Sequence, residues 1–311
     1  MVSKEEYKQY VKELVGEDNK GHEIKYLTKS YKGTSSTLVT IGVVLFTLTF
    51  LIFMIGSGAF IFAVLGIVFI IIGAIRTVNT TSAARYYKKN YRGLILDYLL
   101  KGYEYSFIPE GKVSERIFKD SQFGGYYEDY NGTDKLTISI PNDDGSKSGC
   151  DLTLCDLNVT KTVEDSDGDK RTVTVYKGVF GYVEFPFEFK CILCVDSNYK
   201  KSGKTLKGVT LEDIVFNKKF MVISDDQIES RYILTPTMME NLLALEKRFN
   251  GTKITLVDNR MYIGAIHKDL FELEGIYGTN IEEAFNVFYD EIEAILKLID
   301  EIKNNNKVFK M

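Results

Sequence analysis

The sequence predicts an α+β protein in which an N-terminal two-helix transmembrane hairpin precedes a cytoplasmic domain. That domain is expected to combine a mainly antiparallel sheet with a long C-terminal amphipathic helix. Three observations support this fold class. Residues 38–75 contain no charged side chain, residues 103–275 read mainly as strands joined by polar turns, and residues 281–302 repeat apolar side chains at helical spacing. The 311 residues allow one or two folded units.

Residues 1–37 are predicted to hold a short amphipathic helix on the cytoplasmic side. Ser3 and Glu6 have the spacing of a capping box, in which each side chain bonds the backbone N–H of the other residue. Gly16 is a typical helix stop. This helix is expected to lie either on the membrane or against the folded body.

Residues 38–75 are predicted to cross the membrane twice. One span needs about 20 apolar residues, so a run of this length is sufficient for two short spans. Gly56-Ser57-Gly58 lies at its centre and allows a tight reversal. The predicted spans are therefore residues 38–55 and 59–75.

Residues 76–102 are predicted to form a basic juxtamembrane helix. Residues 76–101 carry six basic side chains and one acidic side chain, and the adjoining 102–311 sum to −10. The basic excess beside the apolar run places both termini in the cytoplasm of a two-span cell-membrane protein. We expect the bilayer, including anionic lipid headgroups, to be contacted by Arg76, Arg85, Lys88, Lys89 and Arg92.

The acidic remainder of the chain argues against nucleic acid as a partner, because phosphate binding requires clustered Lys and Arg. The four cysteines form the pairs Cys150/Cys155 and Cys191/Cys194, which look at first like zinc ligands. Both pairs fall in predicted strands, where residues three or five apart point to opposite faces. Buried free thiols are therefore favoured over zinc, and neither a metal nor a cofactor is predicted.

Within the cytoplasmic domain, residues 103–311, two hairpins give the strongest strand patterns. Residues 150–163 and 170–183 flank an acidic turn, and residues 253–257 and 261–266 flank Asp258-Asn259-Arg260. Between these hairpins, Pro236 has the residue type favoured at the first position of a helix, which is expected to run to Phe249. This mixture of hairpins and few helices favours a mainly antiparallel sheet.

The last helix has the most regular apolar pattern in the chain. Its spacing alternates between three and four residues, which produces one continuous apolar seam. The pattern favours docking of the helix on its own sheet, and the alternative is self-association or binding of a partner helix. The residues of this candidate partner seam are Phe285, Phe288, Ile292, Ile295 and Ile299.

Catalytic motifs are incomplete. Gly203-Lys204-Thr205 matches the end of a phosphate-binding loop, but Asn198 stands where that loop needs its first glycine. The acidic turn at residues 164–169 lacks the Gly and Glu spacing of a calcium loop. Only two histidines are present, and no Ser or Cys can be paired with either of them. We therefore predict no catalytic residue.

Two runs carry a family resemblance: Val209–Phe220, with its acidic and aromatic residues, and Val222–Pro236, which contains Asp-Asp-Gln and Arg-Tyr-Ile-Leu-Thr-Pro. From Tyr86 onward the chain resembles bacterial domain-of-unknown-function family 3137. The resemblance implies no reaction. The residues of the second run favour a buried strand from Arg231 to Leu234, in which Arg231 pairs with a carboxylate, and in the alternative Arg231 and Tyr232 are candidate binding residues.

Two functional hypotheses follow. The first is a membrane-anchored cytoplasmic binding or scaffold module with a protein partner or a second copy at the last helix. The second is a membrane-associated enzyme or ligand sensor with a pocket in residues 103–275 near Arg231. The sequence does not decide whether the chain is an enzyme.

Overall fold

The fold is known from a computed structural model, in which two compact units are distinguished. One comprises Gly102–Glu272 and Phe288–Met311 together with Met1, and the other comprises Val2–Lys101 and Leu273–Val287. The structure describes residues 1–17, 41, 43–44, 67–72, 92–142, 149–197, 206–249, 251–266, 270 and 281–309.

The predicted transmembrane hairpin is corrected by the structure. Among the described residues, no helix is both long enough and apolar enough to cross a membrane. This finding contradicts the predicted fold class in its N-terminal part and, with it, the predicted two-span location in the cell membrane. The prediction relied on the length of an uncharged run, whereas a span requires a continuous apolar helix of about 20 residues. Most of residues 38–75 lie outside the described residues.

The smaller unit contains the predicted N-terminal helix, α1 (Lys4–Glu17), and a second helix, α5 (Arg92–Leu99). The capping box is confirmed, since Glu6 N–H donates to Ser3 Oγ at 3.3 Å and Ser3 N–H donates to the Glu6 carboxylate at 3.1 Å. The two helices are joined by the stacked rings of Tyr10 and Tyr98, whose centroids lie 3.8 Å apart. The hydroxyl of Tyr7 donates to the carbonyl of Phe285 at 3.1 Å.

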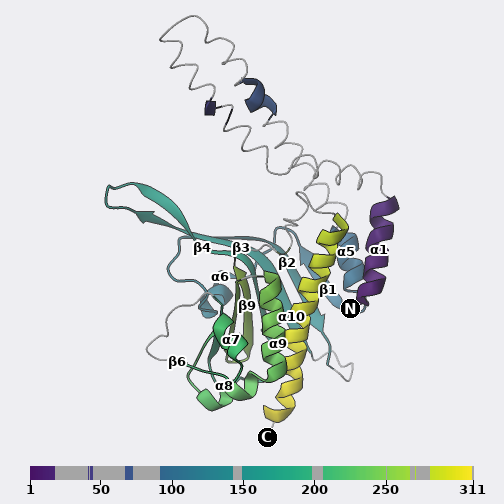
Figure 1. The fold of residues 1–311 in the computed structure, drawn as a ribbon, viewed down its shortest axis with the longest axis vertical. Helices are drawn as coiled ribbons and strands as arrows, with labels where there is room; N and C mark the ends of the chain where they lie inside the picture. The colour runs from purple at the N-terminus through teal and green to yellow at the C-terminus, as the bar shows by residue number, and fades with distance from the viewer. Residues whose placement is uncertain are drawn as a thin grey trace, which may run out of the picture. The chain divides into compact units, whose positions relative to one another are not determined.

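The larger unit is built on a nine-stranded sheet with the order β1-β2-β3-β4-β9-β8-β5-β7-β6 (Figure 1). Every pairing among the described strands is antiparallel, which confirms the predicted sheet type. The strands are β1 (Glu104–Ile108), β2 (Asp129–Ile140), β3 (Cys150–Glu164), β4 (Lys170–Glu184), β5 (Leu193–Asp196), β6 (Lys207–Gly208), β7 (Met221–Ser224), β8 (Thr252–Val257) and β9 (Arg260–Ile266).

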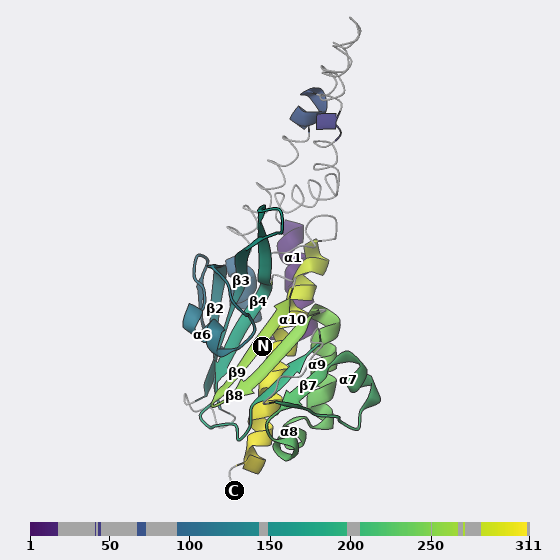
Figure 2. The ribbon, with the colours of Figure 1, turned by 90° about the vertical axis from the view of Figure 1, so that its left-hand side faces the viewer.

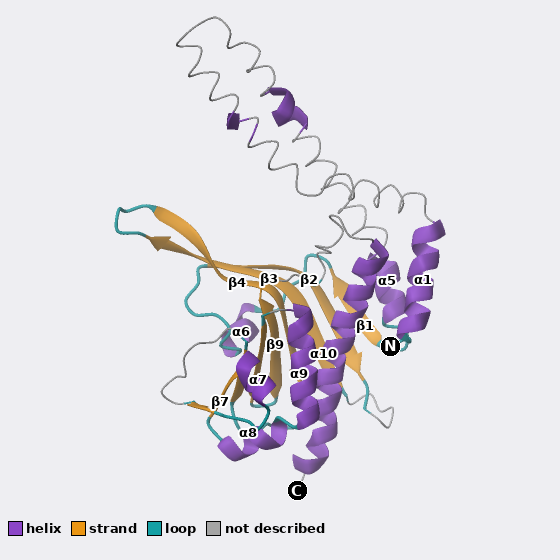
Figure 3. Ribbon diagram, viewed as in Figure 1, coloured by secondary structure: helices purple, strands orange, loops and turns teal. Residues whose placement is uncertain are grey.

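Both predicted hairpins are present. The β3–β4 hairpin is the longer one, and Figure 3 shows its outer part projecting beyond the other strands as a two-stranded ribbon. Its turn is closed by Asp165 Oδ1, which accepts the N–H groups of Asp167 and Asp169 at 3.0 Å each. The register of β3 with β4 shifts between Val159 and Thr160. Such a bulge increases the local twist, and here it coincides with the start of the ribbon.

Two long helices are α9 (Pro236–Phe249) and α10 (Ile281–Phe309). α9 and the part of α10 from Phe288 onward lie along one face of the sheet in the larger unit (Figures 1 and 2). Both helices were predicted. Thr235 caps α9, because its Oγ1 accepts the N–H of Met238 at 3.1 Å, and the same hydroxyl donates to Glu301 of α10 at 2.9 Å. The described part of this unit also contains three shorter helices: α6 (Glu115–Asp120), α7 (Ile214–Lys219) and α8 (Gln227–Ile233).

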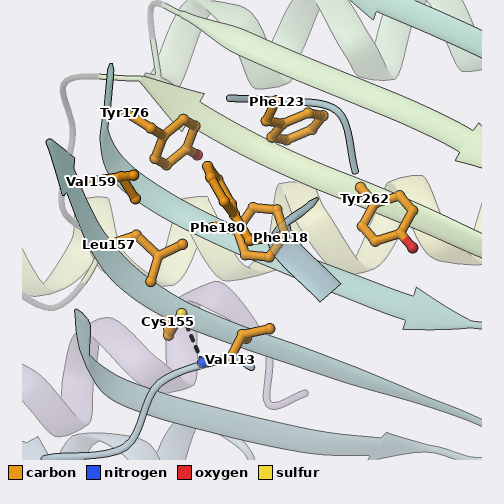
Figure 4. Packing of buried hydrophobic residues seen from close by; sticks show 9 residues of the cluster. All are labelled: Val113, Phe118, Phe123, Cys155, Leu157, Val159, Tyr176, Phe180 and Tyr262. Atoms are coloured by element: carbon orange, nitrogen blue, oxygen red, sulfur yellow. Dashed lines mark hydrogen bonds between the residues drawn. The ribbon is translucent and has the colours of Figure 1, made fainter. Parts of the chain in front are cut away.

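The other face of the sheet carries a buried aromatic cluster beneath α6. Figure 4 shows its nine side chains: Val113, Phe118, Phe123, Cys155, Leu157, Val159, Tyr176, Phe180 and Tyr262. The ring of Phe118 lies 5.1 Å from that of Phe180, in the edge-to-face geometry that aromatic pairs favour. Gly264 provides room for this packing, since a Cβ there would come within 2.5 Å of Phe123.

Candidate interaction surface

Four large apolar side chains are exposed on the two short helices that follow β6 and β7. Ile214 and Val215 of α7 are 69% and 65% exposed, and Ile228 and Tyr232 of α8 are 69% and 59% exposed. Together with Arg231 we call these residues the α7–α8 surface. Single exposed apolar residues are ordinary, but Ile228 and Tyr232 lie four residues apart on one helix face, which makes α8 the centre of the candidate site.

An aspartate cap sets the orientation of α7. Asp213 Oδ1 accepts the N–H groups of Val215 and Phe216 at 2.7 and 2.9 Å, so the helix begins at Ile214. Phe216 then points inward and its ring lies 4.8 Å from that of Phe220, which is also buried. Because Phe216 occupies the buried face of this first turn, Ile214 and Val215 are left in solvent.

An equivalent aspartate begins α8. Asp226 Oδ1 accepts the N–H groups of Ile228 and Glu229 at 2.8 and 3.0 Å, and these two bonds lower the pKa of Asp226. Ser230 and Ile233 are buried. Positions i, i+3 and i+4 of a helix lie on one face, so Ile228, Arg231 and Tyr232 share the outward side of α8.

Arg231 ties α8 to the segment that leads into α7. Its Nη1 donates to the carbonyl of Gln227 at 2.5 Å, and its Nη2 donates to the carbonyl of Thr210 at 3.2 Å. The side-chain amide of Gln227 adds a bond to the carbonyl of Gly208 at 3.3 Å. The guanidinium group therefore has a fixed position while its outer side remains exposed.

These contacts correct the prediction of a buried strand from Arg231 to Leu234. Arg231 and Tyr232 belong to helix α8, and both side chains are exposed. The guanidinium group of Arg231 donates to two backbone carbonyls and not to a carboxylate. The aspartate cap at Asp226 starts a helix where the β-branched and aromatic residues favoured a strand.

The candidate partner seam of α10 is buried within the chain. Phe285, Phe288, Ile292, Ile295 and Ile299 are all buried. Polar contacts hold the helix along its length, including an ion pair of Arg248 with Asp290 at 2.9 Å and a bond from Lys303 Nζ to the carbonyl of Pro141 at 2.7 Å. In this structure the seam stabilises the fold, and it is not accessible to a partner.

The basic residues expected at a membrane surface are mostly outside the described part of the chain. Arg76, Arg85, Lys88 and Lys89 lie there. Arg92 is described, stands at the start of α5 and is only 5% exposed, so its guanidinium is not presented to solvent.

The four cysteines are free thiols. Cys150, Cys155 and Cys191 are buried, as predicted, and Cys194 is half-buried. Burial raises the pKa of Cys155 to about 12, although its sulfur accepts the N–H of Val113 at 3.4 Å, which acts in the opposite direction. Among the residues that the structure describes, no group of three or more His, Cys, Asp or Glu side chains is placed to hold a metal.

The sequence interpretation found two of the five surface residues and missed Ile214, Val215 and Ile228. The missed residues share one signal: each is an apolar residue placed one or two positions after a capping aspartate, in a helix too short to show periodicity. Arg231 and Tyr232 were found only because they lie in a run that resembles the family.

The fold is α+β, with exposed apolar side chains on two short helices, and comparison with known proteins adds a family match. A family described as "Protein of unknown function (DUF3137)" matches residues 174–304, which include α7 and α8 and confirm the resemblance inferred from the sequence. No curated protein matches the chain.

A solved structure is similar at a distance. The crystal structure of the mycobacterial trehalose monomycolate transport factor A, TtfA, shares 10% sequence identity with a TM-score of 0.36, over 68% of this chain and 96% of that protein. A likeness this distant assigns no activity to the chain.

Proposed function

We propose that the chain is a binding or scaffold module that docks a protein partner on the α7–α8 surface. The observation that carries this proposal is the exposed face of α8, on which Ile228 and Tyr232 flank the fixed guanidinium of Arg231. Tyr and Arg are the residue types most enriched among those that dominate binding energy at protein interfaces.

The neighbouring helix supports the same reading. Ile214 and Val215 add apolar area at the start of α7, and the bond from Arg231 to Thr210 ties α8 to the segment that leads into α7. The two sequence runs that contain these helices, residues 209–220 and 222–236, lie within the residues matched by the family of unknown function. The second hypothesis, an enzyme or sensor with a pocket near Arg231, stays a prediction, and the contacts of Arg231 are to backbone carbonyls at an exposed site.

The proposal is tested by co-purification of the tagged full chain from its source cells. The double variant Ile228→Asp with Tyr232→Asp is compared with Tyr126→Asp, because Tyr126 is 73% exposed and lies outside the surface. We expect the double variant to recover at least about tenfold less of its specific partner than wild type does. That decrease corresponds to a loss of more than about 1.4 kcal/mol in binding free energy. The Tyr126 control should keep that partner. Equal recovery by both variants, with unchanged melting temperatures, would contradict the proposal.

A further inference from the structure

The charges around the α7–α8 surface indicate the chemistry of its partner. Resting on the proposed function, we infer that the surface recognises an acidic, apolar-containing peptide segment of a partner protein. A carboxylate of that segment pairs with Arg231, and its apolar side chains contact Ile228 and Tyr232.

Arg231 is already oriented for such a contact. A guanidinium group has five N–H donors, and the structure gives Arg231 two bonds, to the carbonyls of Gln227 and Thr210. Those bonds restrain the side chain before any partner arrives, which reduces the entropy lost on binding. The remaining donors match the two oxygens of a carboxylate, the geometry in which Arg binds most strongly.

Three of the nearby carboxylates, Asp213, Asp225 and Asp226, accept backbone N–H groups, whereas Glu212 is exposed and Glu229 is half-buried. Asp213 and Asp226 each accept two helix N–H groups, and Asp225 Oδ1 accepts the N–H of Ile192 at 2.7 Å. Within the described part of the chain, no carboxylate lies within ion-pair distance of Arg231. The neighbouring Lys219 differs, because its Nζ lies 2.8 Å from a carboxylate oxygen of Glu246.

This arrangement favours an acidic segment over a neutral or basic one. Covering Ile228 and Tyr232 would also remove water from Arg231, and a desolvated cation without a partner is costly. A carboxylate in the bound segment avoids that cost, whereas an amide compensates less and a lysine opposes binding. A second copy of the chain is the competing occupant, and its acidic side chains could supply the same group.

The probe is an array of synthetic 12-residue peptides that contain Leu, Ile or Phe, each made in matched Glu, Gln and Lys versions. Purified full-length wild type, Arg231→Gln and Ile228→Asp are applied, and the dissociation constants of bound peptides are measured. We expect wild type to bind Glu versions about tenfold more tightly than Gln versions, the effect of one good charged hydrogen bond. Arg231→Gln should bind both versions alike, and Ile228→Asp should weaken both.

The outcomes separate this inference from the proposed function. Equal binding of Glu and Gln versions that is lost in Ile228→Asp would overturn the acidic partner and leave the surface intact. Persistent Glu preference in Arg231→Gln would also overturn it. Absence of any peptide binding, or binding unaffected by Ile228→Asp, would overturn both proposals. A wild-type dimer in solution that Ile228→Asp converts to monomer would replace the peptide with a second copy.

Discussion

Helices α10 and α8 both carry apolar side chains at helical spacing, yet the seam of α10 is buried, whereas Ile228 and Tyr232 of α8 are exposed. On α10 the seam that includes Ile292 and Ile295 is covered by the chain itself. On α8, Ile228 and Tyr232 stand in solvent on either side of Arg231. The apolar pattern alone therefore does not tell whether the chain itself covers a helix face, and the structure shows that it covers the seam of α10 and leaves Ile228 and Tyr232 exposed.

The difference follows from helix length and from what each helix can reach. α10 has 29 residues, and its part in the larger unit makes polar contacts to other segments of that unit, such as that of Lys303 with Pro141. α8 has seven residues, and its buried side is already filled by Ser230 and Ile233. Its remaining large apolar residues, Ile228 and Tyr232, are exposed.

The largest expected effect is on α10. Ile295→Asp places a carboxylate at a fully buried position, and we expect a loss of about 4–5 kcal/mol in the free energy of unfolding. Urea denaturation followed by circular dichroism measures this loss. A change below about 1 kcal/mol would show that the seam is not part of the core.

An intermediate effect is expected for the buried carboxylate of Glu246. Burial raises its pKa, but Lys219 and the N–H groups of Thr252 and Gly251 outweigh burial and hold the pKa below the ordinary 4.5. Glu246→Gln should lower the free energy of unfolding by about 2 kcal/mol at pH 7, because hydrogen bonds to a charged group contribute about that much.

The pH dependence of Glu246 gives a second readout. Because its folded-state pKa is lowered, its stabilising contribution is present above pH 4.5 and is lost as the pH falls through the folded-state value. The stability difference between wild type and Glu246→Gln should therefore shrink below pH 4.5. A difference that grows on acidification would contradict this assignment.

A smaller effect is expected at the cap of α7. Asp213→Ala removes the acceptor for the N–H groups of Val215 and Phe216 and should cost about 1 kcal/mol, whereas Asp213→Asn should retain most of that stability. Thermal denaturation of the two variants measures the difference. Equal melting temperatures would mean that the cap does not orient Ile214 and Val215.

The smallest effect on stability is expected at α8. Ile228→Asp makes the same chemical change as Ile295→Asp, yet it should alter the free energy of unfolding by no more than about 0.5 kcal/mol. Asp at the second position of a helix is also compatible with the helix dipole. A loss comparable to that of Ile295→Asp would show that Ile228 supports the fold, and the contrast between the helices would fail.

The sequence interpretation succeeded where the pattern was long. The β3–β4 hairpin, the start of α9 at Pro236 and α10 from Ile281 to Ile302 follow from alternation, turn chemistry and helical spacing. The interpretation failed where a few residues decide the secondary structure of a short segment. Arg231 to Leu234 has strand-like residues, but the cap at Asp226 and the burial of Ser230 and Ile233 select a helix. The exposure of Ile228 depends on tertiary packing, which no local pattern contains.

The central claim is that the outward face of α8 contacts a partner, and site-specific photo-crosslinking tests it most directly. A photoreactive phenylalanine analogue is placed at Tyr232 or, as the matched control, at Tyr126, which is exposed beside Glu128 and outside the surface. After illumination in source cells, we predict a discrete protein adduct at position 232 that Ile228→Asp abolishes, and no such adduct at position 126. Absence of an adduct at position 232, or equal adducts at both positions, would contradict the account.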